Sequence, residues 1–188
     1  MKKIYIFLML FLVSLTVFSQ NKKFSVEVNY PLAFSEFVKF TGIVDAGLKY
    51  QFTTNESINY GASFTFDYLK ADRDRDFVRD YLFFHVNGFS ETIIPSLNKI
   101  HVFFGAGFTY VTHDSISFFH TDDYTDVIKD KENDSGFNLK FGAQYDLSSR
   151  FFVQSYYHFI RTYDKSRISD NIFKIHYNQV KLGVGVRF

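Results

Sequence analysis

Hydrophobic and polar residues alternate along most of the chain. The C-terminal stretch NQVKLGVGVRF shows this most clearly, with one face formed by Val180, Leu182, Val184, Val186 and Phe188. The other face holds polar residues and glycines. A period of two is typical of a β-strand, because successive side chains point to opposite sides. The stretch therefore predicts a strand with one apolar face that runs to the last residue.

The same alternation recurs in seven earlier segments, at 24–30, 44–52, 58–68, 82–86, 100–110, 137–147 and 151–159. Their apolar faces carry no charged residue, and Ser155 is the one small polar residue among them. The segment 82–86 is the least regular, because Phe83 interrupts its polar face. We expect eight strands, each with one charge-free side.

The opposite faces are rich in glycine and amide side chains. They also carry eight charged residues, four acidic and four basic: Glu27, Asp45, Lys49, Asp67, Lys140, Asp146, Lys181 and Arg187. Equal numbers of acids and bases can pair with one another. These residues are the candidates for a polar network on one side of the sheet.

The connections between the expected strands alternate in length. The links near 53–56 and 148–150 are tight, and the link through 90–99 is moderate. Four longer loops are expected at 31–41, 70–76, 112–135 and 164–174. All long loops then fall at one end, as in an up-and-down antiparallel barrel.

Two barrel architectures fit eight such strands. A secreted lipocalin-like barrel turns its apolar face inward around a ligand, whereas a transmembrane β-barrel turns it outward to lipid. The lumen of an eight-stranded barrel is just wide enough for side chains, which explains the glycines on the polar face. Tyrosines gather at the strand ends, where amphipathic rings meet a membrane interface. The pattern favours the transmembrane barrel, with the lipocalin-like binder as an alternative.

Composition narrows the class further. The 188 residues include 26 Phe and 13 Tyr, which favour strands, and they contain no Cys, so a disulfide framework and a lipid anchor on Cys are both excluded. The 21 basic and 20 acidic residues are balanced. A nucleic-acid partner is therefore not expected.

The first residues have the features of an export signal. Lys2 and Lys3 precede an apolar run from Ile4 to Phe18, and Val17 and Ser19 suit a signal-peptidase site. We expect residues 1–19 to be a cleaved signal peptide and residues 20–188 to form one barrel domain. An uncleaved anchor is the alternative, although the apolar run is short for a spanning helix.

Together, the export signal, the eight amphipathic strands, the loop asymmetry and the terminal GVGVRF resemble the small outer-membrane β-barrel family, of the OmpA-like or porin-family type. The resemblance implies a Gram-negative outer-membrane location, with lipid and lipopolysaccharide as surroundings. In that family, a last strand of alternating apolar residues ending in Phe is the signal read by the barrel-assembly machinery. Leu182, Val184, Val186 and Phe188 match that pattern.

Candidate chemistry is sparse. His85 and His158 fall on the polar face, and some eight-stranded outer-membrane barrels modify lipid A with a His, a Ser and an acid. The segments HVNGF and HFIRT lack the Ser of the deacylase pattern, and His113 and Ser115 lie near a loop. We therefore assign no catalytic, cofactor-binding or metal-binding residue.

The acidic stretch within 112–135 carries seven residues of interest: His120, Asp122, Asp123, Asp126, Asp130, Glu132 and Asp134. Dense carboxylates suit Ca²⁺ or cation bridges to lipopolysaccharide, but the EF-hand spacing is absent. A solvated loop is the simpler interpretation. Phe118 and Phe119 within it could contact an extracellular partner.

Three functions follow from the sequence, in order of preference. The first is a non-enzymatic outer-membrane barrel with four external loops, a lumen filled by side chains, and a structural or surface-interaction role. The second is a barrel enzyme of the lipid A deacylase or acyltransferase class. The third is the secreted lipocalin-like binder.

Overall fold

The computed structural model describes residues 23–34, 39–53, 58–74, 77–120, 125–165 and 172–188. The segment expected to be a signal peptide, 1–19, lies outside these ranges. The strands are β1 (Phe24–Phe34), β2 (Lys39–Gln51), β3 (Ile58–Asp74), β4 (Phe77–Ile94), β5 (Leu97–His120), β6 (Thr125–Asp146), β7 (Phe151–Lys165) and β8 (Ile172–Arg187). In the described part of the chain, no helix has the length and apolarity needed to cross a membrane.

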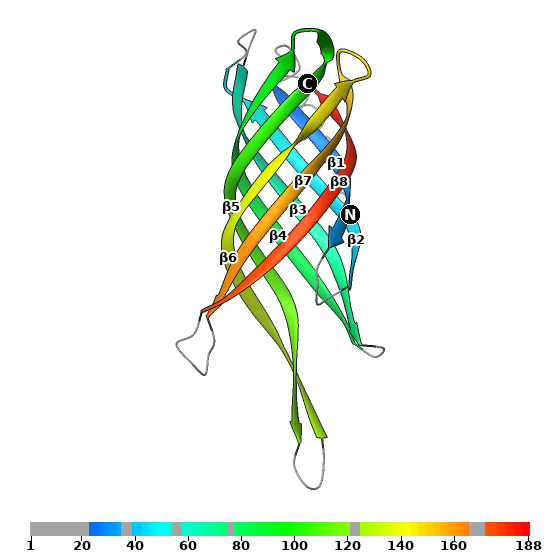
Figure 1. The fold of residues 1–188 in the computed structure, drawn as a ribbon. Coiled ribbons are helices and arrows are strands. Elements are labelled where there is room, and N and C mark those ends of the chain that lie inside the picture. Colours follow the sequence, from blue (N-terminus) through cyan, green and yellow to red (C-terminus); the bar gives the residue numbers. More distant parts are fainter. Residues whose placement is uncertain (1–22, 35–38, 54–57, 75–76, 121–124, 166–171) are drawn as a thin grey trace, which may run out of the picture.

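The strands form a closed antiparallel barrel in sequence order (Figure 1). β1 pairs with β8 from Ser25 opposite Arg187 to Phe34 opposite Asn178, which closes the sheet. Closure leaves no open edge along the barrel wall. The sequence-based expectation of an eight-stranded up-and-down barrel is confirmed.

The two ends of the barrel differ (Figure 1). At one end, β4 and β5 are joined by a turn of two residues, Pro95 and Ser96. The C-terminus lies at the same end. We call this the short-turn end. From the other end, the hairpin end, β5 and β6 project beyond the remaining strands.

The projecting hairpin corrects the loop expected at 112–135. β5 continues to His120 and β6 begins at Thr125, with the two strands paired along this length. The other three expected long loops are also shorter, because their flanking strands continue past the apolar alternation. Backbone hydrogen bonds extend a strand whether or not one face is apolar, so the hydrophobic pattern underestimates its length.

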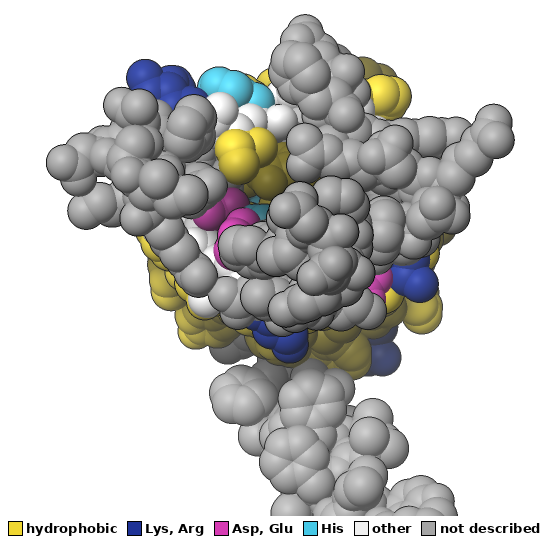
Figure 2. Space-filling view, turned by 90° about the horizontal axis from the view of Figure 1, so that it is seen from below, with side chains coloured by type: hydrophobic (Ala, Val, Ile, Leu, Met, Phe, Trp, Pro, Cys, Tyr) yellow, Lys and Arg dark blue, Asp and Glu magenta, His cyan; other side chains and the backbone are white. Residues whose placement is uncertain are grey.

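The alternation orients the side chains as the transmembrane alternative requires. Phe64, Phe108 and Phe141 are 45%, 55% and 56% exposed on the outer wall. Viewed from the hairpin end, hydrophobic and acidic side chains both appear in the opening, and hydrophobic ones cover much of the visible outer wall (Figure 2). The apolar faces are therefore turned outward, and the lipocalin-like arrangement is wrong.

The inner wall changes character along the axis. Towards the short-turn end it carries charged and amide side chains, and we call this part the charged-lumen segment. Towards the hairpin end it holds a cluster of seven buried apolar residues: Leu69, Ala71, Tyr81, Phe83, Val111, Ile160 and Tyr177. We call this part the aromatic-lumen segment.

Phe83 belongs to the aromatic-lumen segment. Its ring is fully buried and lies edge-on to Tyr177, with centroids 5.1 Å apart. The interruption of the polar face at Phe83 thus marks an apolar core inside the barrel, and β4 is a continuous strand through this position.

Candidate functional site: the side chains that fill the lumen

The inner wall of the charged-lumen segment holds the eight charged residues identified in the sequence. Six of them are nearly inaccessible, namely Glu27, Asp45, Lys49, Asp67, Lys140 and Lys181. Asp146 and Arg187 lie nearer the short-turn end and are partly accessible. An isolated buried charge is very costly, and most of these groups are ion-paired, whereas Lys140 Nζ donates to Ser63 Oγ at 2.7 Å.

Lys181 is the centre of a fully buried ion cluster. Its Nζ lies 2.5 Å from Asp45 Oδ2 and 2.5 Å from Asp67 Oδ2, and all three side chains are 0% exposed. The residues come from β8, β2 and β3, so the contacts cross the lumen between strands that are not all neighbours. The ammonium group therefore ties opposite sides of the barrel together.

A second pair lies beside this cluster. Lys49 Nζ is 2.6 Å from Glu27 Oε2 and also donates to Gln154 Oε1 at 3.0 Å. The amide nitrogen of Gln154 donates in turn to Glu27 Oε2 at 2.9 Å and to Asn29 Oδ1 at 2.7 Å. One amide thus joins β7 to β1 and β2 across the lumen.

The lumen near the short-turn end contains two ionisable residues that the sequence reasoning missed, Glu91 and His101. His101 Nδ1 lies 2.8 Å from Glu91 Oε1, and its Nε2 lies 3.0 Å from Asp146 Oδ2. Arg187 completes the group, 2.8 Å from Asp146 Oδ1. Glu91 continues the inward period of His85 and Asn87, but it was assigned to the link 90–99 because β4 was expected to end earlier.

Aromatic rings fill the space between the charges. Lys49 Nζ lies over the Phe103 ring at 4.7 Å from its centroid, and the Arg187 guanidinium lies over Phe152 at 4.9 Å. Tyr156 packs edge-on to Phe103, with centroids 5.7 Å apart. Cations over aromatic faces are stabilised by the ring quadrupole, especially where water is excluded.

Glycines give these large side chains their room. A Cβ at Gly47 would lie 2.8 Å from Glu27 Oε1, and one at Gly105 would lie 2.9 Å from Lys140 Cε. Real Cβ atoms do not approach so closely. The small residues on the polar face thus have a packing role in a narrow barrel.

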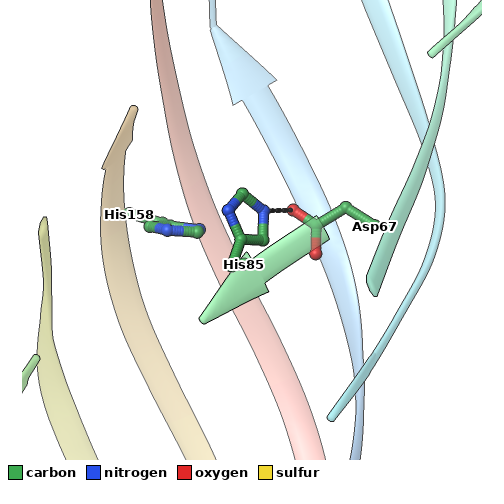
Figure 3. Close-up of side chains that lie close together, drawn as sticks. All are labelled: Asp67, His85 and His158. Carbon is green, nitrogen blue, oxygen red and sulfur yellow. Dashed lines mark hydrogen bonds and ion pairs between the residues drawn. The ribbon is translucent and has the colours of Figure 1, made fainter. Parts of the chain in front are cut away.

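His85 and His158 lie together between the two lumen segments. Their ring centroids are 4.5 Å apart, and Asp67 completes the cluster (Figure 3). All three residues are buried, and they come from β4, β7 and β3. Figure 3 shows the His85 ring between the other two side chains, with its hydrogen bond to Asp67.

Directional hydrogen bonds link this cluster to Lys181. His158 Nε2 donates to Asn138 Oδ1 at 3.1 Å, and Asn138 Nδ2 donates to Thr109 Oγ1 at 2.9 Å. Thr109 Oγ1 lies 2.7 Å from His85 Nδ1. His85 Nε2 lies 3.2 Å from Asp67 Oδ2, which Lys181 also contacts.

The arrangement of Asp67, His85 and Thr109 has the order of an acid, a base and a hydroxyl, as in hydrolases. However, His85 and Thr109 are completely buried inside the barrel, whereas a lipid substrate would approach the outer wall. The hydroxyl is also occupied by Asn138. The geometry does not offer a nucleophile to a lipid ester.

The acidic stretch of the hairpin lies mostly beyond what the structure describes in side-chain detail. His120, Asp122, Asp123, Asp126, Asp130, Phe118 and Phe119 are outside the described side chains. Glu132 and Asp134 are described, and both approach His113, at 3.5 Å and 3.8 Å. These two carboxylates are thus paired with an imidazole at the base of the hairpin.

The terminal strand places its apolar residues on the outer wall. Leu182 and Val184 are exposed there, and Val186 is partly exposed. The Phe188 ring lies 6.4 Å from that of Phe24, and its backbone nitrogen donates to Phe24 O at 2.7 Å. The last residue is therefore part of the barrel wall at the short-turn end.

The outer wall also has a hollow of about 440 Å³ over β6, β7 and β8, next to Tyr145 and Leu182. It lies where two small outward residues, Ala143 and Ser155, are paired across neighbouring strands.

A closed eight-stranded antiparallel barrel with an apolar wall and a polar lumen is the architecture of small outer-membrane barrels, and the structure is similar to several of them. Neisserial surface protein A superposes with a TM-score of 0.52 over 88% of this chain and 96% of that chain, at 11% identity.

Ail, the attachment invasion locus protein of Yersinia pestis, superposes with a TM-score of 0.53 over 88% of this chain and 96% of that chain, at 13% identity. A further structure of Ail contains the heparin analogue sucrose octasulfate, and its TM-score is 0.52. At these identities the similarity establishes the fold. No protein-family model and no curated protein sequence matches the chain.

Proposed function

We propose that residues 20–188 form an integral protein of the Gram-negative outer membrane, exported by a signal peptide at 1–19. In this proposal the protein is not an enzyme. The barrel anchors an external surface, formed by the four connections at the hairpin end, and its lumen is closed by its own side chains.

The observation that carries the membrane location is the charge-free outer wall around a charged lumen. Large apolar side chains stand exposed on every side of the charged-lumen segment, for example Val28, Phe64, Phe104, Phe141 and Val184. In water, such a wall would be a large unpartnered hydrophobic surface. In lipid, it is the favourable arrangement, and the closed barrel satisfies every backbone group.

The outer tyrosines mark two levels of the barrel wall. Tyr50, Tyr60 and Tyr145 are exposed near the short-turn end, and Tyr30 and Tyr110 are exposed nearer the hairpin end. Two such groups suit the two interfaces of a bilayer. By analogy with outer-membrane barrels generally, short turns face the periplasm and long connections face outward.

A lumen filled in this way should not conduct ions. Purified protein in planar bilayers should show no stable nanosiemens steps, because Phe103, Phe152 and Tyr156 fill the space that the ion pairs leave. A variant with all three rings replaced by Ala is the matched opened control and should raise the conductance. Stable large steps with the unchanged protein would overturn the closed-lumen proposal.

The external role rests on the hairpin. Its sequence from 112 to 135 contains seven carboxylates, including Asp114, and two lysines. A partner with a basic surface suits this charge balance. The heparin analogue bound by Ail is polyanionic, so the hairpin is unsuited to the same kind of ligand. Deleting 116–129, which removes three of the seven carboxylates, should weaken binding to a basic partner while leaving the heat-modifiable gel mobility of the barrel unchanged.

A further inference from the structure

We propose that Asp67, His85 and His158 bind one divalent transition-metal ion of the Zn²⁺ type inside the lumen. The inference is independent of the surface role. Two imidazoles and one carboxylate form the kind of three-residue set that holds zinc with a fourth position left for water. The charged lumen thereby contains a specific ligand site as well as ion pairs.

The spacing of the three donor atoms suits a single ion. One ligand atom from each residue lies within 4.8 Å of the other two. A point between three atoms so placed lies within about 2.8 Å of each of them. Side-chain rotations of less than about 1 Å would shorten these distances to the ~2.0–2.2 Å of zinc–nitrogen and zinc–oxygen bonds.

The neighbouring side chains already orient both rings for such a role. Metal-bound histidines usually use the second ring nitrogen to donate to a nearby acceptor. His158 Nε2 does so towards Asn138 Oδ1, which leaves the Nδ1 lone pair for a ligand. For His85, Thr109 Oγ1 lies 2.7 Å from Nδ1. On metal binding, Nδ1 donates to that oxygen and the Nε2 lone pair faces the ion beside Asp67.

Two buried atoms of the cluster have no hydrogen-bond partner among the described residues, His158 Nδ1 and Asp67 Oδ1. Both residues are at least nine-tenths buried, at 1% and 0% exposure. A buried polar atom without a partner costs free energy. A metal ion would satisfy both, and it would leave Asp67 Oδ2 and Asp45 on Lys181.

The surrounding charges set the limits of this site. Lys181 and Lys140 are the nearby cations, and they weaken the affinity for a second positive charge. Asp45 also contacts Lys181, so the ammonium keeps a second carboxylate partner when Asp67 binds the ion. The nitrogen-rich donor set favours Zn²⁺, Co²⁺ or Ni²⁺ over Ca²⁺ or Mg²⁺, which prefer oxygen ligands.

Access requires that the ion be added while the barrel is still open. The aromatic-lumen segment separates the donors from the hairpin end. Its Phe83 ring stacks next to His85, with centroids 6.0 Å apart. Protein refolded into detergent micelles with Co²⁺ should retain about one ion per barrel after desalting. It should show the visible absorption of low-symmetry Co²⁺. Without Cys in the chain, any such bands arise from nitrogen and oxygen ligands.

Two single variants and one control test the assignment. His85→Gln and His158→Gln should each lose the retained Co²⁺ and its bands, whereas His176→Gln, an exposed residue of the outer wall, should keep both. Thr109→Val should weaken retention by roughly ten- to a hundredfold, the usual effect of losing the partner that orients a metal-bound histidine. Heat-modifiable gel mobility reports whether each variant has folded.

Three results would overturn the proposal. The first is that the refolded protein retains no Co²⁺. The second is that the His85→Gln/His158→Gln double variant retains as much Co²⁺ as the unchanged protein. The third is that His176→Gln loses the ion. If a variant fails to fold, X-ray absorption of the unchanged protein decides the matter. A shell with two imidazoles and one carboxylate supports the site, and any other shell rejects it.

Discussion

The charged-lumen segment and the aromatic-lumen segment share the same eight strands but have opposite polarity. In the first, Lys181 and Asp45 face inward while Phe141 faces outward. In the second, Phe83 and Ile160 face inward. Many outward positions there are polar, namely Lys70, Asp80, Thr112, Ser135, Arg161, Lys174 and His176, although Leu32 and Phe34 of β1 remain apolar and exposed.

This inversion teaches that the surroundings of the wall decide its composition. Backbone pairing continues through both segments, from Ala46 opposite Phe66 to Ala71 opposite Arg79 and beyond. A wall that meets lipid must be apolar and can place charges inside, whereas a wall that meets water must be polar and needs an apolar core. The change in polarity of the outer wall therefore marks the limit of the proposed membrane-embedded zone on the side of the hairpin end.

The largest effect is expected at the ion cluster of the charged-lumen segment. Lys181→Met leaves Asp45 and Asp67 buried without a cation, which should lower the free energy of unfolding by about 3–5 kcal/mol. Denaturant titration in detergent micelles, with chelator present, measures this change. Adding Asp45→Asn and Asp67→Asn should recover most of the loss. A loss below about 1 kcal/mol would contradict the pairing.

A second comparison places the same charge at two outward positions of β6, one in the charged-lumen segment and one in the aromatic-lumen segment. Phe141→Arg should lower the stability by roughly 2–4 kcal/mol and hinder insertion, because the position faces lipid in the proposed membrane arrangement. Ser135→Arg, on the polar outer wall, should change it by no more than about 0.5 kcal/mol. Heat-modifiable gel mobility after refolding into lipid vesicles measures both. Equal behaviour of the two variants would show that the boundary between the segments is misplaced.

A third test concerns the end of the lipid-facing wall. Phe188→Ala should lower the stability by about 1–2 kcal/mol, because it removes a partly buried ring beside Phe24. If Leu182, Val184, Val186 and Phe188 are read during assembly, the amount in the outer membrane should fall much further. Purified protein should still refold. Normal membrane levels, with only the unfolding midpoint shifted, would reject the assembly signal.

The smallest effect is expected in the aromatic-lumen segment. Phe83→Leu keeps an apolar side chain of similar shape, so it should cost less than about 1.5 kcal/mol, as in a water-soluble core. Denaturant titration under the conditions used for Lys181→Met gives a direct comparison. A loss larger than that of Lys181→Met would mean that the two segments are not held by different interactions.

The sequence was sufficient for the barrel but not for its full height. Strand number, order and the direction of the apolar faces follow from the alternation, and the structure confirms them. The extent of β5 and β6 does not, because neither face of a water-exposed ribbon needs to be apolar. Glu91 was missed for a related reason, since its strand continues past the regular pattern.

What the amino-acid sequence alone determined is which side of each strand is charge-free along its alternating segment, because this depends only on a period of two. What only the tertiary structure decided is which inward residues meet. Lys181 contacts Asp45 and Asp67, which are separated from it by 136 and 114 residues along the chain. His85, His158 and Asp67 likewise meet across the lumen, on β4, β7 and β3. Closure of the sheet brings these positions together, and closure depends on the pairing of all eight strands.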